Sequence, residues 1–86
     1  MRILKNLFVK MQSLDECKQI MFDALWNCKQ IQELFKKYND LKFTGKHELI
    51  KHEYYQIWES EEQNQVYMAY CRDMRNPVEI IWKGLS

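Results

Sequence analysis

The strongest pattern in the chain is a stripe of apolar residues that recurs at alternating steps of three and four between Leu14 and Tyr38. This spacing places all of them on one side of an α-helix. Ser13 and Glu16 form a capping-box pattern at its start, and Asn39-Asp40 ends the run. We therefore predict one long helix from about residue 14 to residue 38. The stripe consists of Leu14, Cys17, Met21, Ala24, Cys28, Ile31, Phe35 and Tyr38.

The same stripe is also a heptad seam over several repeats, so a coiled-coil dimer is an alternative. The positions beside the seam include Ile20, Leu25 and Leu34. They lack the complementary charges that a specific two-stranded coil uses. A broad apolar face packed inside a helical bundle explains these residues better.

The first eleven residues carry a weaker apolar pattern. It suits one face of a helix, but the consecutive residues Leu7, Phe8 and Val9 suit a short strand nearly as well. Both interpretations stay open. The apolar positions are Ile3, Leu4, Leu7, Phe8 and Met11.

The second half of the chain favours helices by its spacing and its capping signals. Residues 46–58 place several apolar side chains on one helical face. Ser60 followed by Gln63 is a second capping-box pattern, and it precedes an apolar run that starts at Val66. Asn76-Pro77 ends that run and could start another helix.

A sheet is the rival interpretation of the same residues. Three segments rich in aromatic and branched residues could form an antiparallel meander packed on the long helix. Strict alternation of apolar and polar residues is missing between Val66 and Cys71, which counts against strands. The three segments are Tyr54–Trp58, Val66–Arg72 and Val78–Trp82.

Composition supports the helical interpretation. The 86 residues form a single domain, 1–86, and contain only two glycines and one proline, which is few for a chain of many hairpins. Lys, Glu, Gln, Leu and Met outnumber the branched residues typical of strands. We predict a mostly α fold, a small helical bundle built on one long helix in the N-terminal half. The alternative is an α+β fold in which that helix packs on a small antiparallel sheet.

Charge is close to balanced overall but differs between the two halves. The net charge is +1. Residues 1–51 hold ten Lys or Arg against six Asp or Glu, whereas residues 52–86 hold three against six. Net charges of +4 and −3 follow, so the molecule could carry a basic end and an acidic end unless folding brings the halves together.

The three cysteines and the absence of a long apolar run indicate in which cellular compartment the protein is located. An odd number of cysteines without close pairing argues against a disulfide framework and favours free thiols in a reducing environment. No run approaches the roughly 20 apolar residues that span a bilayer. We therefore expect a cytoplasmic protein without membrane association.

Residues that could support catalysis or metal binding are not arranged for it. His47 and His52 are five apart, about 140° around a helix, and cannot share a zinc ion as a pair four apart does. Cys17 and Cys28 would lie about 16 Å apart along a helix. With two glycines there is no glycine-rich phosphate loop. We expect no enzyme activity, no metal, no cofactor and no small-molecule substrate.

A basic stretch supports nucleic-acid binding as an alternative function. Two helices joined near residues 58–62 would resemble a helix-turn-helix. Glu61 and Glu62, however, would occupy the end of the second helix that normally contacts bases, where they would repel phosphates. The basic stretch consists of Lys36, Lys37, Lys42, Lys46 and Lys51.

Two aromatic residues lie away from the apolar stripe of the long helix. Measured from Cys17, Phe22 and Trp26 are about 140° and 180° around the helix. Aromatic anchors within a polar rim are typical of protein-binding surfaces, although another segment of the chain, such as the one with Phe8, could also cover them. The predicted partner-binding residues are Phe22, Leu25, Trp26, Lys18, Lys29 and Glu33.

These observations favour a small non-catalytic protein that acts by binding other proteins. It would be a regulator, an inhibitor or an adaptor of a larger partner, or it would associate with itself. The nucleic-acid-binding module is the second hypothesis.

Overall fold

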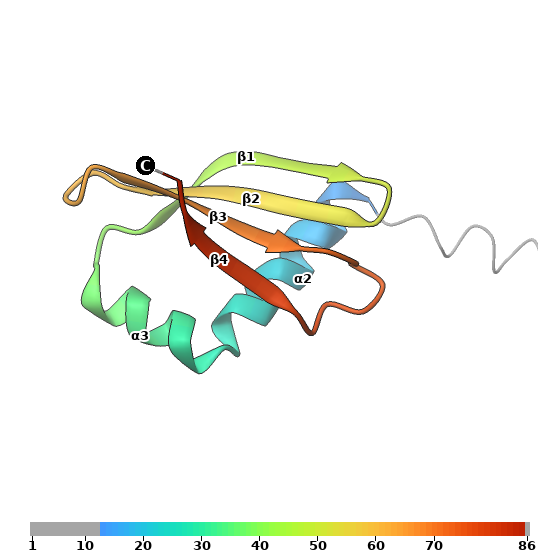
Figure 1. Ribbon diagram of the computed structural model, residues 1–86, viewed down its shortest axis with the longest axis horizontal. Helices are drawn as coiled ribbons and strands as arrows, with labels where there is room; N and C mark the ends of the chain where they lie inside the picture. The colour runs from blue at the N-terminus through green and yellow to red at the C-terminus, as the bar shows by residue number, and fades with distance from the viewer. Residues whose placement is uncertain (1–12, 86) are drawn as a thin grey trace, which may run out of the picture.

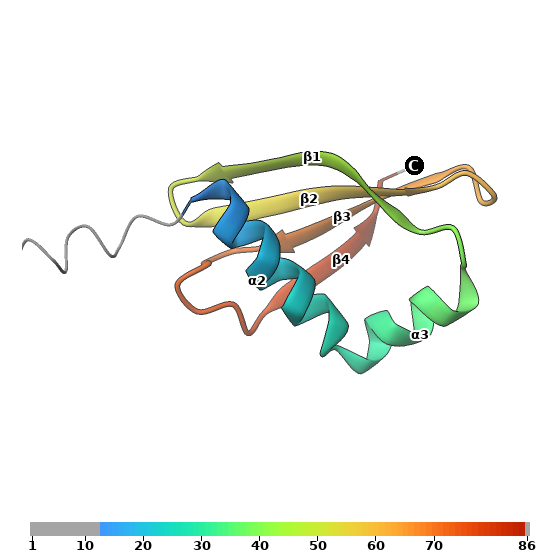
Figure 2. The same ribbon diagram turned by 180° about the vertical axis from the view of Figure 1, so that it is seen from behind.

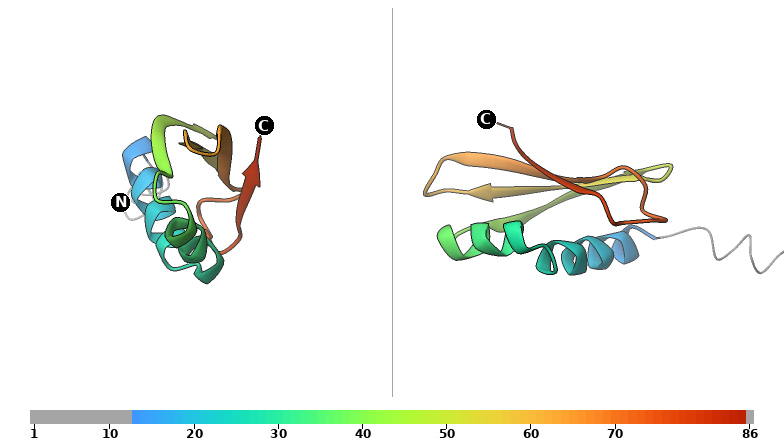
Figure 3. Two further views of the ribbon diagram at one scale, coloured as in Figure 1. Left: turned by 90° about the vertical axis from the view of Figure 1, so that its left-hand side faces the viewer. Right: turned by 60° about the horizontal axis from the view of Figure 1, so that its bottom comes forward.

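The computed structural model describes residues 13–85, which form two short helices followed by a four-stranded antiparallel sheet (Figure 1). The strands pair in sequence order as a meander, β1-β2-β3-β4. Both helices lie against the same face of the sheet, and no helix of residues 13–85 covers the opposite face (Figures 2 and 3). The elements are α2 (Leu14–Trp26), α3 (Lys29–Lys37), β1 (Lys42–Ile50), β2 (Glu53–Ser60), β3 (Gln65–Cys71) and β4 (Ile80–Gly84).

This architecture corrects the predicted helical bundle. The mostly α prediction is wrong, and the chain has an α+β fold in which a four-stranded sheet occupies the second half. The helix or strand expected in the first eleven residues lies outside the described residues. No helix within residues 13–85 is both long and apolar enough to cross a membrane.

The single helix predicted from residue 14 to residue 38 is wrong as well, because it is broken at Asn27 and Cys28. The Asn27 side-chain amide donates to the Asp23 carbonyl at 2.8 Å, and Cys28 has an extended backbone with φ −94° and ψ 115°. An asparagine side chain that bonds to the backbone competes with helix continuation. The spacing of the apolar residues does not reveal this break, because α2 and α3 both turn their apolar side to the sheet. Met21 of α2 and Ile31 of α3 are both buried there.

The predicted start of the first helix is confirmed. Ser13 Oγ accepts a hydrogen bond from the Glu16 backbone N–H at 3.1 Å, and Glu16 Oε1 accepts one from the Ser13 backbone N–H at 2.8 Å. This reciprocal pair satisfies two backbone donors that a helix start would otherwise leave unpaired. The same bonds hold the pKa of Glu16 below its usual value.

Strand β2 shows why residues 46–58 do not form a helix. Its side chains alternate, so that Tyr54, Gln56, Trp58 and Ser60 are buried beneath the helices while those between them are partly exposed. Aromatic and branched residues at such positions favour a pleated surface packed on one side. In β3 the alternation is weak because both faces of that central strand carry apolar side chains.

The second capping signal belongs to a tight turn instead of a helix. Ser60 Oγ does accept a hydrogen bond from the backbone N–H of Gln63, at 3.3 Å, but it also donates to Asp40 Oδ1 at 2.6 Å. Asn64 has a positive φ of 53°, and β3 begins at the next residue. The helix-turn-helix interpretation is therefore wrong, and residues 61–64 close the hairpin between β2 and β3. Asn76-Pro77 likewise lies in the loop that joins β3 to β4.

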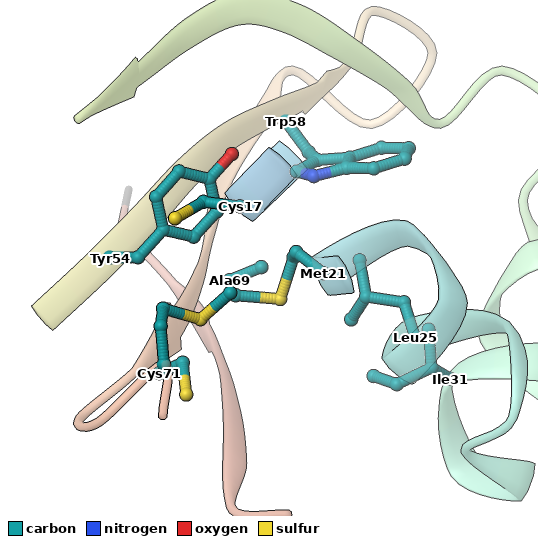
Figure 4. Close-up of a cluster of buried hydrophobic side chains, with 9 residues drawn as sticks. Cys17, Met21, Leu25, Ile31, Tyr54, Trp58, Ala69 and Cys71 are labelled. Atoms are coloured by element: carbon teal, nitrogen blue, oxygen red, sulfur yellow. The ribbon is translucent and has the colours of Figure 1, made fainter. Parts of the chain in front are cut away.

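The core lies between the helices and the inner face of the sheet (Figure 4). Side chains from α2 and α3 meet side chains from β2 and β3, and Met74 from the loop after β3 joins them. Burial of these side chains is the main source of stability for a fold of this size. The labelled core residues are Cys17, Met21, Leu25, Ile31, Tyr54, Trp58, Ala69 and Cys71.

Candidate functional site

An apolar groove lies between the last turns of α2 and the last turn of α3, above Trp58 of β2. It has a volume of about 260 Å³, and every residue that lines it is apolar. This volume is below the roughly 300–1,000 Å³ of pockets that enclose drug-sized ligands. Its size and chemistry suit one or two large side chains of another molecule. The lining residues, which we call the α2–α3 groove, are Phe22, Leu25, Trp26, Phe35 and Trp58.

Trp26 forms the exposed wall of this groove. Its relative exposure is 66%, and its ring centroid lies 6.0 Å from that of Phe35. It is the last residue of α2, and its carbonyl oxygen accepts a hydrogen bond from Nε2 of Gln32, across the helix break. The break therefore positions the indole at the edge of the groove and leaves most of it in water.

The floor of the groove belongs to the core and is held by aromatic packing. The Trp58 ring centroid lies 5.4 Å from that of Phe35 and 5.9 Å from that of Phe22. Phe22 also packs edge-to-face on Phe43 of β1 at 5.5 Å. Leu25 is only 1% exposed. Because these side chains are fixed by several elements, the groove is formed before any partner arrives.

Polar side chains surround the groove on the α3 side. Gln32 and Lys36 line a neighbouring depression together with Trp26 and Phe35. Lys29 and Glu33 are exposed on the same helix. An apolar centre with a polar rim is the usual anatomy of a protein-binding surface.

Three of the six predicted partner-binding residues line the α2–α3 groove, and the other three do not. Trp26 is exposed as expected, but Phe22 is half-buried and Leu25 is buried. The buried stripe of α2 is centred on Met21, not on Cys17, which places Phe22 only about 100° from its centre. Lys18 lies two turns before Trp26, and Lys29 and Glu33 belong to α3.

Sequence reasoning missed Phe35 and Trp58 as members of the site. The sequence pattern places Phe35 on the apolar stripe of the single long helix, on the side away from Trp26, and Trp58 on the apolar face of the helix predicted for residues 46–58. Phe35 comes beside Trp26 only because the chain bends at Asn27 and Cys28, and Trp58 comes from β2. No local signal in the sequence reports either relationship.

The basic stretch is not gathered into one patch. Lys36 and Lys37 end α3, Lys42 and Lys46 lie along β1, and Lys51 lies in the turn after it. The nine residues of β1 extend about 30 Å, which separates Lys42 at the start of the strand from Lys51 just after its end. Lys42 Nζ also lies 3.8 Å from Glu59 Oε1 and 3.5 Å from Glu61 Oε1.

Groups with potential for chemistry are held in structural roles. His47 Nδ1 lies 2.9 Å from the hydroxyl of Tyr54. Burial raises the pKa of both Cys17 and Cys71, which keeps these thiols protonated and poorly nucleophilic. Within residues 13–85, no three His, Cys, Asp or Glu side chains are grouped to hold a metal ion.

Comparison with protein-family models, with curated proteins and with solved structures finds no match to this chain.

Proposed function

We propose that this chain is a small non-catalytic binding protein whose α2–α3 groove holds large apolar side chains of a protein partner. The observation that carries the proposal is the exposure of Trp26 beside an entirely apolar depression. A tryptophan that is 66% exposed gains little from the fold of its own chain. It is available to contribute to the stability of a complex.

The free energy available at Trp26 is sufficient for an anchor. Burial of the exposed part of its side chain removes on the order of 100–150 Å² from water, which corresponds to roughly 3 kcal/mol before the cost of association. Tryptophan is also among the residues that most often dominate binding energy at interfaces. A single contact of this size can decide between binding and no binding.

The partner we propose is a short segment of a larger protein with one or two large apolar residues. The groove is too small for a folded element to enter, and its lining offers no polar group to orient a small-molecule substrate. Lys36 beside Trp26 and Phe35 favours a carboxylate next to the apolar anchor. Such a protein would act in the cytoplasm as a regulator, an inhibitor or an adaptor.

The test is capture of partners from an extract of the source cells with the full chain and two matched variants. Trp26→Ala should remain folded and should lose the specific partner, since the side chain is mostly in water in the free protein. Ile81→Glu, on the opposite face of the sheet, should retain it. A partner captured equally by the wild-type chain and by Trp26→Ala would contradict the proposal.

A further inference from the structure

A polar depression of about 370 Å³ lies at one end of the sheet, where the β1–β2 turn meets the loop after β3 (Figure 1). The backbone N–H of Met74 donates to the carbonyl oxygen of His52 at 2.8 Å and ties the two segments together. We call this site the basic depression, because positive side chains outnumber negative ones in its lining. The charged lining residues are Lys51, Arg72 and Arg75 against Glu53 and Asp73.

The guanidinium of Arg75 is held in place by Asp73. Nε of Arg75 donates to Oδ1 of Asp73 and Nη2 donates to Oδ2, both at 2.9 Å. The backbone N–H of Arg75 also donates to Oδ1, at 3.0 Å. The fork engages two of the five N–H groups of the guanidinium, and no described residue accepts from the others. The edge formed by Nη1 and Nη2 can therefore donate to a second oxyanion without any rearrangement.

Arg72 and Lys51 add positive charge that the fold does not neutralise. Both side chains are exposed, and neither forms an ion pair with the residues that the structure describes. Lys51 extends from the β1–β2 turn and Arg72 directly follows β3, so the two cations come from the two segments that meet here.

Glu53 is the negative charge in the lining that has no cationic partner among residues 13–85. Its carboxylate accepts a hydrogen bond from the hydroxyl of Tyr70, which lies on the outer face of the sheet, opposite the helices. The charge of Asp73 is opposed by Arg75. Three cations against two carboxylates leave a net charge of +1 in the depression.

We propose that the basic depression binds the phosphate group of a phosphorylated ligand. A phosphate monoester carries a charge of about −1.5 to −2 at pH 7 and has three acceptor oxygens. The free edge of Arg75 can meet two of these oxygens, while Arg72 and Lys51 supply two further cations. A single carboxylate, with one negative charge and two oxygens, would use fewer of these donors.

Titration of the full chain with inorganic phosphate tests the site, followed by the NMR shifts of the backbone amides at about pH 7.5 and constant ionic strength. The amides of residues 51–53 and 72–75 should move together and saturate. Because the site is open to water, we expect a dissociation constant of about 1–10 mM. Shifts spread over the whole surface, or no saturation by about 50 mM phosphate, would overturn the proposal.

Charge variants locate the phosphate. Arg72→Gln and Lys51→Gln should each weaken binding by about five- to tenfold, and both should fold because these side chains are exposed. Lys83→Gln removes the same charge at an exposed position of β4 outside the depression and should bind like the wild type. An equal loss in Lys83→Gln would show a response to overall charge and would overturn the proposal.

Glu53→Gln is the variant with the opposite expectation. It retains an acceptor for the hydroxyl of Tyr70 but removes the unpaired negative charge, so phosphate should bind about threefold more tightly. Unchanged affinity would contradict a phosphate beside this residue. Trp26→Ala should bind phosphate like the wild type, because Trp26 belongs to the α2–α3 groove. The two sites can therefore fail independently.

Two further ligands distinguish the sources of the phosphate group. Tighter binding of a short peptide with one phosphoserine would assign the site to a phosphorylated protein, and tighter binding of glycerol phosphate would assign it to a small molecule. The same peptide with an unmodified serine should not bind. Equal binding of the two peptides would overturn the proposal.

Discussion

Trp58 and Gln56 are joined by a buried hydrogen bond in which the indole Nε1 donates to the side-chain Oε1 at 2.9 Å. Nε2 of Gln56 donates to the hydroxyl of Tyr54 at 3.0 Å, and that hydroxyl lies 2.9 Å from Nδ1 of His47. Gln56 and Tyr54 are fully buried. Each polar group in this series of hydrogen bonds therefore depends on its neighbours, because water cannot replace a lost partner.

Replacement of Trp58 by Phe should therefore destabilise the fold. The variant loses ring volume from the core and leaves Oε1 of Gln56 without its donor. We expect the free energy of unfolding to fall by about 2–4 kcal/mol in urea denaturation.

Trp82→Phe is the matched control for Trp58→Phe. Nε1 of Trp82 is buried and has no hydrogen-bond partner among the described residues, so this change leaves no acceptor unpaired. The free energy of unfolding should therefore fall by about 1–2 kcal/mol less in Trp82→Phe than in Trp58→Phe. Equal losses for the two variants would show that the bond to Gln56 contributes nothing.

Tyr54 should make the stability of the fold sensitive to alkaline pH. Burial raises the pKa of Tyr54 to about 12 from 10.0. The folded state therefore favours the protonated phenol, whose contribution is complete below pH 10 and is lost as the pH rises through 12. Relative to Tyr54→Phe, the wild-type chain should lose up to about 2 kcal/mol of stability between pH 9 and pH 12.

Tyr55→Phe serves as the control for this pH dependence. A hydrogen bond to Glu48 raises the pKa of Tyr55, but this side chain lies on the face of the sheet opposite the helices, in contact with water. Its replacement should alter the pH profile less than Tyr54→Phe does. Denaturation curves at several pH values measure both, and identical profiles for the wild type and Tyr54→Phe would refute the role of Tyr54.

The turn between β1 and β2 holds a strained residue. Lys51 has a φ of 58°, a conformation that costs free energy for any side chain with a Cβ atom. Lys51→Gly should raise the free energy of unfolding by up to about 1 kcal/mol. His52→Gly, at the adjacent residue with negative φ, should lower it by about 0.5–1 kcal/mol, because glycine only adds freedom to the unfolded chain there. Thermal unfolding of both variants measures these changes. A decrease in stability for Lys51→Gly, or an increase for His52→Gly, would contradict the strain assigned to Lys51.

The features that sequence analysis predicted correctly are local. The start of α2 depends on Ser13 and Glu16, which lie three residues apart and bond to each other. The exposure of Trp26 follows from its angular position on a helix, which the sequence contains.

The features that it missed depend on contacts between distant residues. The apolar stripe continues from α2 into α3 because both helices face the same sheet, so the spacing conceals the break at Asn27. Strand β3 lacks alternation because its outer face is apolar as well, and this made Met68 and Tyr70 resemble part of a helix. Ser60 forms its expected bond to Gln63, but the contact with Asp40 decides that the bond closes a turn.

The central claim, that the α2–α3 groove binds large apolar side chains, is tested most directly with peptides selected from a random displayed library on the full chain. The selected peptides should share one or two large apolar residues and should change the fluorescence of Trp26 when titrated. Trp26→Ala should bind them at least about tenfold more weakly, while Ile81→Glu should bind them like the wild type. Peptides without an apolar anchor, or with equal affinity for Trp26→Ala, would contradict the account.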